Sequence, residues 1–291
     1  MEEAILEKYR KAGVMLKEVR ENAVPRVKKG AKLLDVANEI EAEIFSKGGK
    51  PAFPVNISIN SEAAHDTPGV DDERVFCDDI VKVDIGIHID GYIADTAVTV
   101  DLSNNPDLVK ASRKALEEAI KLVRAGVNTQ ELGAVIEETI DGFGFKPVYN
   151  LTGHGLEQYV QHSEPAIPNK RIGQGVELKA GQVIAIEPFA TDGIGIVVEG
   201  SLMEIFGISR VKPVRMPYER EVLKAIQEYN GLPFAARWLS NIKFLDKALT
   251  SLMRQGIIHG YPVLVEHQHG MVSQAEHTMI VTEDGCELTT A

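Results

Sequence analysis

The sequence predicts a mixed α/β fold, with two similar halves around a largely antiparallel sheet and a helical insertion in the second half. Three features support this: a repeated order of two helices and a strand, an Asp-Gly turn between two β-branched strands, and a series of predicted helices between residues 206 and 265. The chain has 291 residues, 44% of them hydrophobic, which allows a large core. We expect one domain over residues 1–291, with residues 206–265 as a subdomain inserted within it.

The N-terminal half begins with two helices and an extended segment. Apolar residues recur at helical spacing over residues 3–23. A second helix is expected from about Leu33 to Lys47, where two glycines end it, and residues 50–60 are extended. The same order returns at residues 106–124, 129–141 and 144–150.

This repetition extends to individual residues. Sliding the chain along itself by 96 residues lays Gly30–Pro51 on Gly126–Pro147 without a gap, and seven of the 22 aligned positions are identical. These include the pairs Gly30/Gly126, Gly48/Gly144, Lys50/Lys146 and Pro51/Pro147. The alternative is a chance likeness in the spacing of helices, glycines and prolines. We interpret the pattern as an internal duplication, and a ligand site between two such halves would suit the usual location of pockets at interfaces.

The segment Val81–Val100 is predicted to form a β-hairpin. Its two β-branched strands are joined by Asp-Gly at positions 90 and 91, a dipeptide that favours a type I′ turn. With this turn Gly86 faces Asp95 across the strands, and alternation places Asp84 on the same face, the two carboxylates roughly 5–8 Å apart. The other face is apolar and belongs to the core. Two carboxylates on a buried hairpin are costly unless a cation neutralises them. The alternative is that both lie on the solvated side of an edge hairpin.

The second half continues with three strands around an insertion. The strands are expected near Gln182–Ala190, Gly195–Glu199 and Gln274–Thr282. The insertion is predicted to be helical at Pro217–Tyr229, Phe234–Leu239 and Phe244–Gln255.

Charge and composition exclude several classes of protein. The formal net charge of −12 argues against a general nucleic-acid or anionic-membrane surface, because phosphate binding needs clustered Lys and Arg. The N-terminus lacks the apolar stretch of a signal peptide, and no run of about 18 apolar residues predicts a membrane span. The two cysteines, Cys77 and Cys286, make no disulfide framework and are expected to be reduced. We therefore expect a cytoplasmic protein.

Three further segments place an ionisable residue among apolar or glycine neighbours. His154 lies between two glycines, Glu187 ends an apolar strand, and Glu276 begins another. Each alone is more typical of an exposed strand-end carboxylate or a hydrogen-bonded histidine. Together with Asp84 and Asp95, they offer four carboxylates and one imidazole. Such a set suits two divalent ions that share carboxylates.

The set Asp84, Asp95, His154, Glu187 and Glu276 resembles, in order and context, the ligands of the methionine aminopeptidases of the pita-bread metallopeptidase family. Supporting stretches are 53–60, 64–68, 83–91, 186–189 and 276–278. The insertion, with its stretches 232–239 and 261–264, resembles the type II branch. We expect the chain to start directly at the catalytic domain, which resembles the archaeal members. The likeness covers nearly all of the chain and implies a pita-bread fold.

The resemblance implies how the metals are held. Asp84 would bind one ion, Asp95 and Glu276 would bridge both, and His154 and Glu187 would complete the other. A hydroxide between the ions would attack the scissile carbonyl, with Glu187 as general base. The family uses two divalent ions, and cobalt, manganese, iron and zinc are the candidates.

The resemblance also implies substrate-binding residues. His65 would lie beside the N-terminal residue that is cleaved, and His162 would contact the peptide carbonyl or the tetrahedral intermediate. The pocket for methionine would be shaped by Phe53, Gly153, His154 and Tyr261. One departure is that Gln161 stands where family members often carry an apolar residue, which is expected to alter the fit to the thioether or to admit water.

The implied activity is removal of the initiator methionine from nascent chains when the second residue is small. Its partners would be nascent N-termini, with the ribosome as a candidate, and the family suggests a monomer that binds no specific nucleic acid. Two alternatives are an Xaa-Pro dipeptidase of the same fold and a catalytically inactive pita-bread binding protein. Among the remaining histidines, His88 is an alternative third hairpin ligand, and His277 is expected to be structural.

Overall fold

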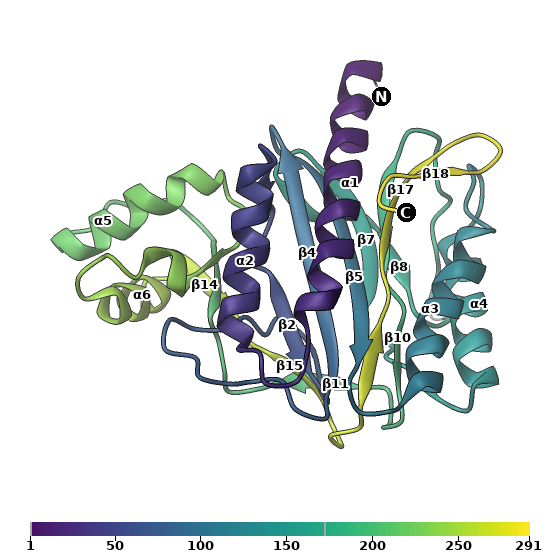
Figure 1. The fold of residues 1–291 in the computed structure, drawn as a ribbon. Helices are drawn as coiled ribbons and strands as arrows, with labels where there is room; N and C mark the ends of the chain where they lie inside the picture. Colours follow the sequence, from purple (N-terminus) through teal and green to yellow (C-terminus); the bar gives the residue numbers. More distant parts are fainter. Residues whose placement is uncertain (1, 172) are drawn as a thin grey trace.

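The structure is a computed structural model that describes residues 2–171 and 173–291. Four helices flank the strands, two in each half (Figure 1). They are α1 (Glu3–Ala23), α2 (Leu33–Ser46), α3 (Pro106–Ile120) and α4 (Thr129–Gly142). Each buries a stripe of residues three or four apart, which is why the predicted helical spacing is confirmed. Among the described residues, no helix is both long and apolar enough to cross a membrane.

The duplicated segments have the same local structure. Gly30 and Gly126 have φ angles of +84° and +83°, a left-handed conformation that favours glycine. The Lys-Pro pairs form the short strands β1 (Lys50–Pro51) and β6 (Lys146–Pro147). Isolated bridges join Lys32 to Val75 and Asn128 to Glu177, and Lys32 and Asn128 are again 96 residues apart. The repeat in the sequence is therefore a repeat in structure.

The predicted hairpin forms with the predicted register. Strands β4 (Ile80–Ile89) and β5 (Tyr92–Asp101) pair antiparallel, with Gly86 opposite Asp95 and Asp84 opposite Ala97. Both turn residues, Asp90 and Gly91, have positive φ, as a type I′ turn requires. The apolar face packs against α1 and α2 in one core cluster. Strand β2 (Asn56–Ile59) pairs with the other side of β4.

The second half is built around a five-stranded antiparallel sheet in the order β18-β17-β9-β7-β8. Its strands are β7 (Thr152–Glu157), β8 (Val160–Pro168), β9 (Val183–Ile186), β17 (His277–Val281) and β18 (Cys286–Leu288). Strands β10 (Phe189–Thr191) and β16 (Val272–Gln274) pair with each other and belong to a separate sheet with β6. All strand pairs among the described residues are antiparallel, as predicted, and they are divided among several sheets.

Two predicted strands are interrupted. The expected strand Gln182–Ala190 is split between β9 and β10 at Glu187-Pro188, and Gln274–Thr282 is split between β16 and β17 just at Glu276. Pro188 has no amide N–H with which to continue a ladder. Each strand therefore passes from one sheet to another at a break, and a carboxylate stands at each break.

The two halves meet along a seam made partly by threonine side chains. Thr96 donates through its Oγ1 to the Glu276 carbonyl at 2.7 Å, and the Glu276 amide donates to the Ala97 carbonyl at 3.0 Å. Thr278 Oγ1 accepts from the Asp95 amide and donates to the Asp95 carbonyl, both at 2.8 Å. Because these contacts fix the backbones of Asp95 and Glu276, each half holds one carboxylate of the other in place.

The insertion lies beside α2 at one side of the molecule (Figure 1). Its helices are α5 (Pro217–Ile226) and α6 (Leu245–Arg254), with 3₁₀ turns at Gln227–Tyr229 and Ala236–Leu239. It also contains a small sheet of β12 (Ile205–Ile208), β13 (Phe234–Ala235) and β14 (Ile258–Tyr261), so the prediction of a helix starting at Phe234 was wrong. Pairing of Phe234 with Phe206 of β12 explains the difference, because that contact is remote in sequence. The remaining elements are β3 (Glu62–Ala64), β11 (Val197–Glu199), β15 (Leu264–Glu266) and a 3₁₀ turn at Val24–Arg26.

One buried ion pair ties the insertion to the first half. Arg237 pairs with Glu41 of α2 and also donates to Thr67 Oγ1 at 2.6 Å and to the Pro68 carbonyl at 3.2 Å. Trp238 Nε1 donates to the same Glu41 carboxylate at 2.8 Å. A single guanidinium therefore contacts α2, the loop that follows β3, and its own subdomain.

Candidate metal centre

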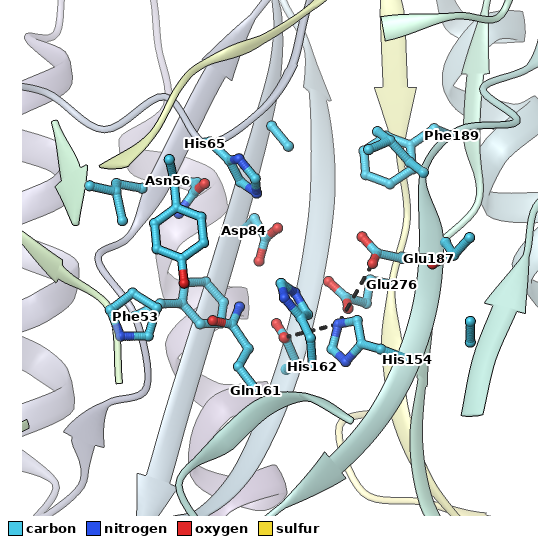
Figure 2. Close-up of a pocket in the computed structure, with 18 of the residues that line it drawn as sticks. Phe53, Asn56, His65, Asp84, His154, Gln161, His162, Glu187, Phe189 and Glu276 are labelled. Carbon is cyan, nitrogen blue, oxygen red and sulfur yellow. Dashed lines mark ion pairs between the residues drawn. The ribbon is translucent and has the colours of Figure 1, made fainter. Parts of the chain in front are cut away.

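The five predicted ligands converge on one pocket of about 500 Å³. Figure 2 shows the carboxylates of Asp84, Glu187 and Glu276 and the ring of His154 turned toward a common space. They come from different elements: Asp84 from β4, Asp95 from β5, His154 from β7, and the two glutamates from the strand breaks. The register of the β4–β5 hairpin places Asp84 and Asp95 on one face. Glu187 and Glu276 lie where a strand is interrupted, so their side chains need not follow the alternation of a continuous strand.

Three of these residues lie at metal-ligating distance from one another. Potential ligand atoms of Asp95, His154 and Glu276 all lie within 4.8 Å of each other, and all three residues are buried. His154 Nε2 is 3.9 Å from Asp95 Oδ2 and 3.6 Å from Glu187 Oε1. This spacing leaves room for a cation between the atoms.

The donor atoms lack the protein partners that buried oxygens normally have. Asp84 Oδ1, Asp95 Oδ1 and both Glu276 carboxylate oxygens are buried, with no hydrogen-bond partner among the described residues. Buried carboxylate oxygens left unpaired are strongly unfavourable. Hard divalent cations bind such oxygens, so the residues present fit a bound divalent metal.

The pKa values of these residues also fit a metal site. Burial is the largest cause of the shift that raises the pKa of Asp84 to about 7. The pKa values of Asp95, Glu187 and Glu276 are raised well above their ordinary values by burial and then by the neighbouring carboxylates. Burial and the nearby His162 lower the pKa of His154 to about 3, so its ring is neutral at physiological pH and able to bind a metal.

Gln274 is a member of this site that was not predicted from the sequence. It is buried, and its Nε2 donates to Asp84 Oδ2 at 3.2 Å and to Glu187 Oε2 at 3.3 Å. The amide thus links a candidate ligand of the first half to one of the second. Its position two residues before Glu276 was the available signal, but a neutral amide near a strand end is an ordinary feature of sequences.

The rest of the pocket has an apolar wall and two histidines. Phe53 lies against Gly86, whose missing side chain leaves space for the phenyl ring. His65 and His162 both line the pocket, and the His65 ring lies 5.8 Å from that of Tyr261. Burial lowers the pKa of His65 to about 4, so this ring is also neutral.

Gly153 lies in β7 between two residues that line the pocket, but it is not itself part of the lining. A Cβ at Gly153 would collide with the Ala185 carbonyl oxygen of β9. Glycine here allows β7 and β9 to approach each other closely, which brings His154 to the cluster.

His88, the alternative hairpin ligand, and His277 both have structural partners. His88 Nδ1 accepts from the Gly91 amide at 3.0 Å within the hairpin turn, and His88 lines a different pocket. His277 Nδ1 lies 2.9 Å from Thr290 Oγ1 and 3.2 Å from the Arg20 guanidinium, which confirms the prediction of a hydrogen-bonded structural histidine.

A duplicated α/β scaffold with a buried carboxylate-rich cluster between its halves defines a metal-dependent hydrolase of the pita-bread type. The chain belongs to metallopeptidase family M24, whose model matches residues 7–283. It is 50% identical to a methionine aminopeptidase of Archaeoglobus fulgidus over 292 aligned positions, covering 100% of both chains. It is 48% identical to one of Methanocaldococcus jannaschii, covering 98% of each. A solved methionine aminopeptidase of Thermotoga maritima is similar in structure, with a TM-score of 0.75 at 25% identity, covering 100% of this chain and 98% of that one. The predicted fold is confirmed, and family and site together indicate the use of a divalent metal.

Proposed function

We propose that this protein is a metal-dependent methionine aminopeptidase, which removes an N-terminal methionine when the second residue is small. One observation carries the proposal: the orphaned carboxylate oxygens of Asp84, Asp95 and Glu276 lie at the end of a pocket that also holds His65 and His162. The full-length identity of 50% to a protein named methionine aminopeptidase supports the choice of activity.

The site is proposed to bind two divalent ions, with cobalt, manganese, iron and zinc as candidates. Asp84 would hold one ion, Asp95 and Glu276 would bridge the pair, and His154 and Glu187 would complete the other. Support comes from the ligand count, since four carboxylates carry more negative charge than one divalent ion would neutralise. Such ions lower the pKa of a water ligand and polarise a carbonyl.

The protein side chains divide the remaining chemistry. Glu187 is proposed as the general base that takes a proton from the attacking water and transfers it to the leaving amine. His162 would donate to the developing oxyanion, and His65 would contact the N-terminal residue. Neutral imidazoles retain one N–H for such donation, and burial lowers the pKa of His162, which supports this role. Such donation would stabilise the tetrahedral intermediate.

The methionine side chain is proposed to occupy the apolar end of the pocket. Phe53 and Tyr261 line this end, and Gly153 and His154 shape its floor through the close approach of β7 and β9. A thioether makes few hydrogen bonds, so burial of its apolar surface would drive binding.

We further propose that residues 1–291 act as one catalytic domain, with residues 206–265 as an inserted subdomain. The distinct apolar cluster of the insertion and its tie through Arg237 support this. The expected substrates are nascent chains in the cytoplasm, with the ribosome as a candidate partner and the monomer as the active form.

The test is metal-dependent peptide cleavage. The protein is stripped with a chelator, restored with Mn²⁺, Co²⁺ or Fe²⁺, and given Met-Gly, Met-Ala and Xaa-Pro peptides. Methionine release from the first two, only after metal is restored, is the expected result. Release from Xaa-Pro peptides alone would identify a dipeptidase of the same fold. A folded, metal-loaded protein without turnover would identify an inactive binding scaffold.

A further inference from the structure

The apolar end of the pocket contains one amide that the protein leaves unused. Three amide side chains line the pocket. Asn56 donates to the Pro54 carbonyl at 2.7 Å, and Asn150 both donates to and accepts from the backbone of Val197. Gln161 makes no side-chain hydrogen bond with any residue in the described part of the chain. Of the three, Gln161 is the one whose side chain has no hydrogen bond to the described residues.

The position of Gln161 directs this amide at the substrate side chain and away from the metal ligands. Figure 2 shows its amide end turned toward Phe53, on the opposite side of the pocket from Glu187 and Glu276. Gln161 is only partly buried, so its amide stays hydrated when a thioether fills the pocket. The same pocket is also lined by the apolar side chains of Ala64, Ile205 and Pro233. A polar group on the substrate would find its hydrogen-bond donor here.

The methionine side chain would gain little from such a donor, because a thioether sulfur accepts only weak hydrogen bonds. Its oxidised form is different. Methionine sulfoxide keeps the length of the side chain but carries a polar, chiral S–O group. A pocket with apolar walls alone would remove that oxygen from water without replacement.

We propose that this pocket also accepts oxidised N-terminal methionine, with the Gln161 amide N–H donating to the sulfoxide oxygen. The inference rests on the proposed function, since it uses the same pocket and the same bond cleavage. Water adds across the first peptide bond: the C–N bond breaks, the acyl carbon gains the hydroxyl, and the leaving amine gains the proton. The S–O bond is unchanged, so no oxidant or reductant takes part. The products are free methionine sulfoxide and the shortened peptide.

The test compares kcat/KM of the metal-loaded enzyme for Met-Ala and Met(O)-Ala peptides, with the two sulfoxide epimers measured separately. The enzyme should cleave both peptides and prefer one epimer. Gln161→Leu, which keeps the volume but removes the donor, should lower the ratio of sulfoxide to methionine cleavage by about tenfold, the effect of one hydrogen bond. The epimer preference should also shrink. A general disturbance of the pocket would not produce this loss.

Gln158→Leu is the matched control. Gln158 lies in the turn between β7 and β8, where its amide donates to the Asp90 carbonyl outside the pocket, so both kcat/KM values should be unchanged. Gln161→Met serves as a second variant if the leucine variant does not fold. Cleavage of Met-Ala without cleavage of either sulfoxide epimer, or an unchanged ratio in the variants, would overturn this inference and leave the proposed function intact. Failure on both peptides would refute the proposed function as well.

Discussion

The two halves of this molecule share one frame but supply their carboxylates differently. The first half presents Asp84 and Asp95 on an unbroken hairpin, where register fixes their spacing. The second half presents Glu187 and Glu276 at points where strands change sheets. A duplicated scaffold therefore does not require a duplicated site. The two halves share their backbone geometry, but each places its carboxylates in the pocket through a different local structure.

The same contrast appears at the aligned glutamates of the repeat. Glu41 is buried and bound by Arg237 and Trp238 of the insertion. Glu137 occupies the equivalent position but is partly exposed, 3.2 Å from the Lys170 ammonium. The two equivalent positions therefore differ: Glu41 is buried against the insertion, whereas Glu137 is partly exposed.

The largest expected effect concerns the ligands. If both halves contribute to one centre, Asp84→Asn and Glu187→Gln should each lower kcat on a Met-Ala peptide by on the order of 10³-fold. Circular dichroism should show an unchanged fold, and the exposed variant Glu138→Gln should retain full activity. Full activity in either ligand variant would remove that half from the mechanism.

The next effect separates the two aligned glutamates. Glu41→Gln should lower the free energy of unfolding by about 3 kcal/mol, because it leaves the buried Arg237 without its counter-ion. Glu137→Gln, its matched control, should cost less than about 1 kcal/mol, since its ion pair is partly exposed. Denaturant titration measures both. Equal losses would contradict the idea that the halves have diverged here.

A smaller effect is expected at the amide that joins the halves. Gln274→Leu removes the donor shared by Asp84 and Glu187 and should weaken Mn²⁺ binding by about 10- to 100-fold, as loss of a group that orients metal ligands usually does. Isothermal titration with Mn²⁺ tests this directly. Activity should recover in part at saturating metal; no change in affinity would assign Gln274 to packing alone.

The smallest effect is on thermal stability without metal. Asp84 has a pKa raised to about 7, and Asp95 and Glu276 have raised pKa values too, so the folded apo-protein binds more protons than the unfolded chain. Its stability should therefore fall as pH rises from 6.5 to 8. His65 and His154, with lowered pKa values, lose stability only at more acidic pH. Scanning calorimetry should show a Tm lower by several degrees at pH 8, which Mn²⁺ reverses. A flat profile would contradict the raised pKa values.

Much of the fold was predictable because it depends on local rules. The hairpin register follows from a two-residue turn and the alternation of side chains, and the helices follow from apolar spacing. The strand breaks were not predictable, because they depend on contacts such as that between the Glu276 amide and the Ala97 carbonyl, far apart in sequence. The strand at Phe234 was missed for the same reason.

The site shows the same division. The five candidate ligands could be proposed because each acid or imidazole is unusual among apolar or glycine neighbours, and the structure places all five on one pocket. Gln274 could not, because its importance arises only when Asp84 and Glu187 are brought together. The individual roles of the five candidate ligands remain predictions.

The guanidinium of Arg237 sets a limit on how far this protein could be shortened. Exchanging residues 206–265 for a brief linker would leave the Glu41 carboxylate, the Thr67 hydroxyl and the Pro68 carbonyl without their common donor. Thr67 is only two positions from His65, whose φ of +65° already holds the backbone in an unfavourable region. A minimal engineered version would need a substitute cation at that spot, or the loop carrying His65 would lose one of its anchors.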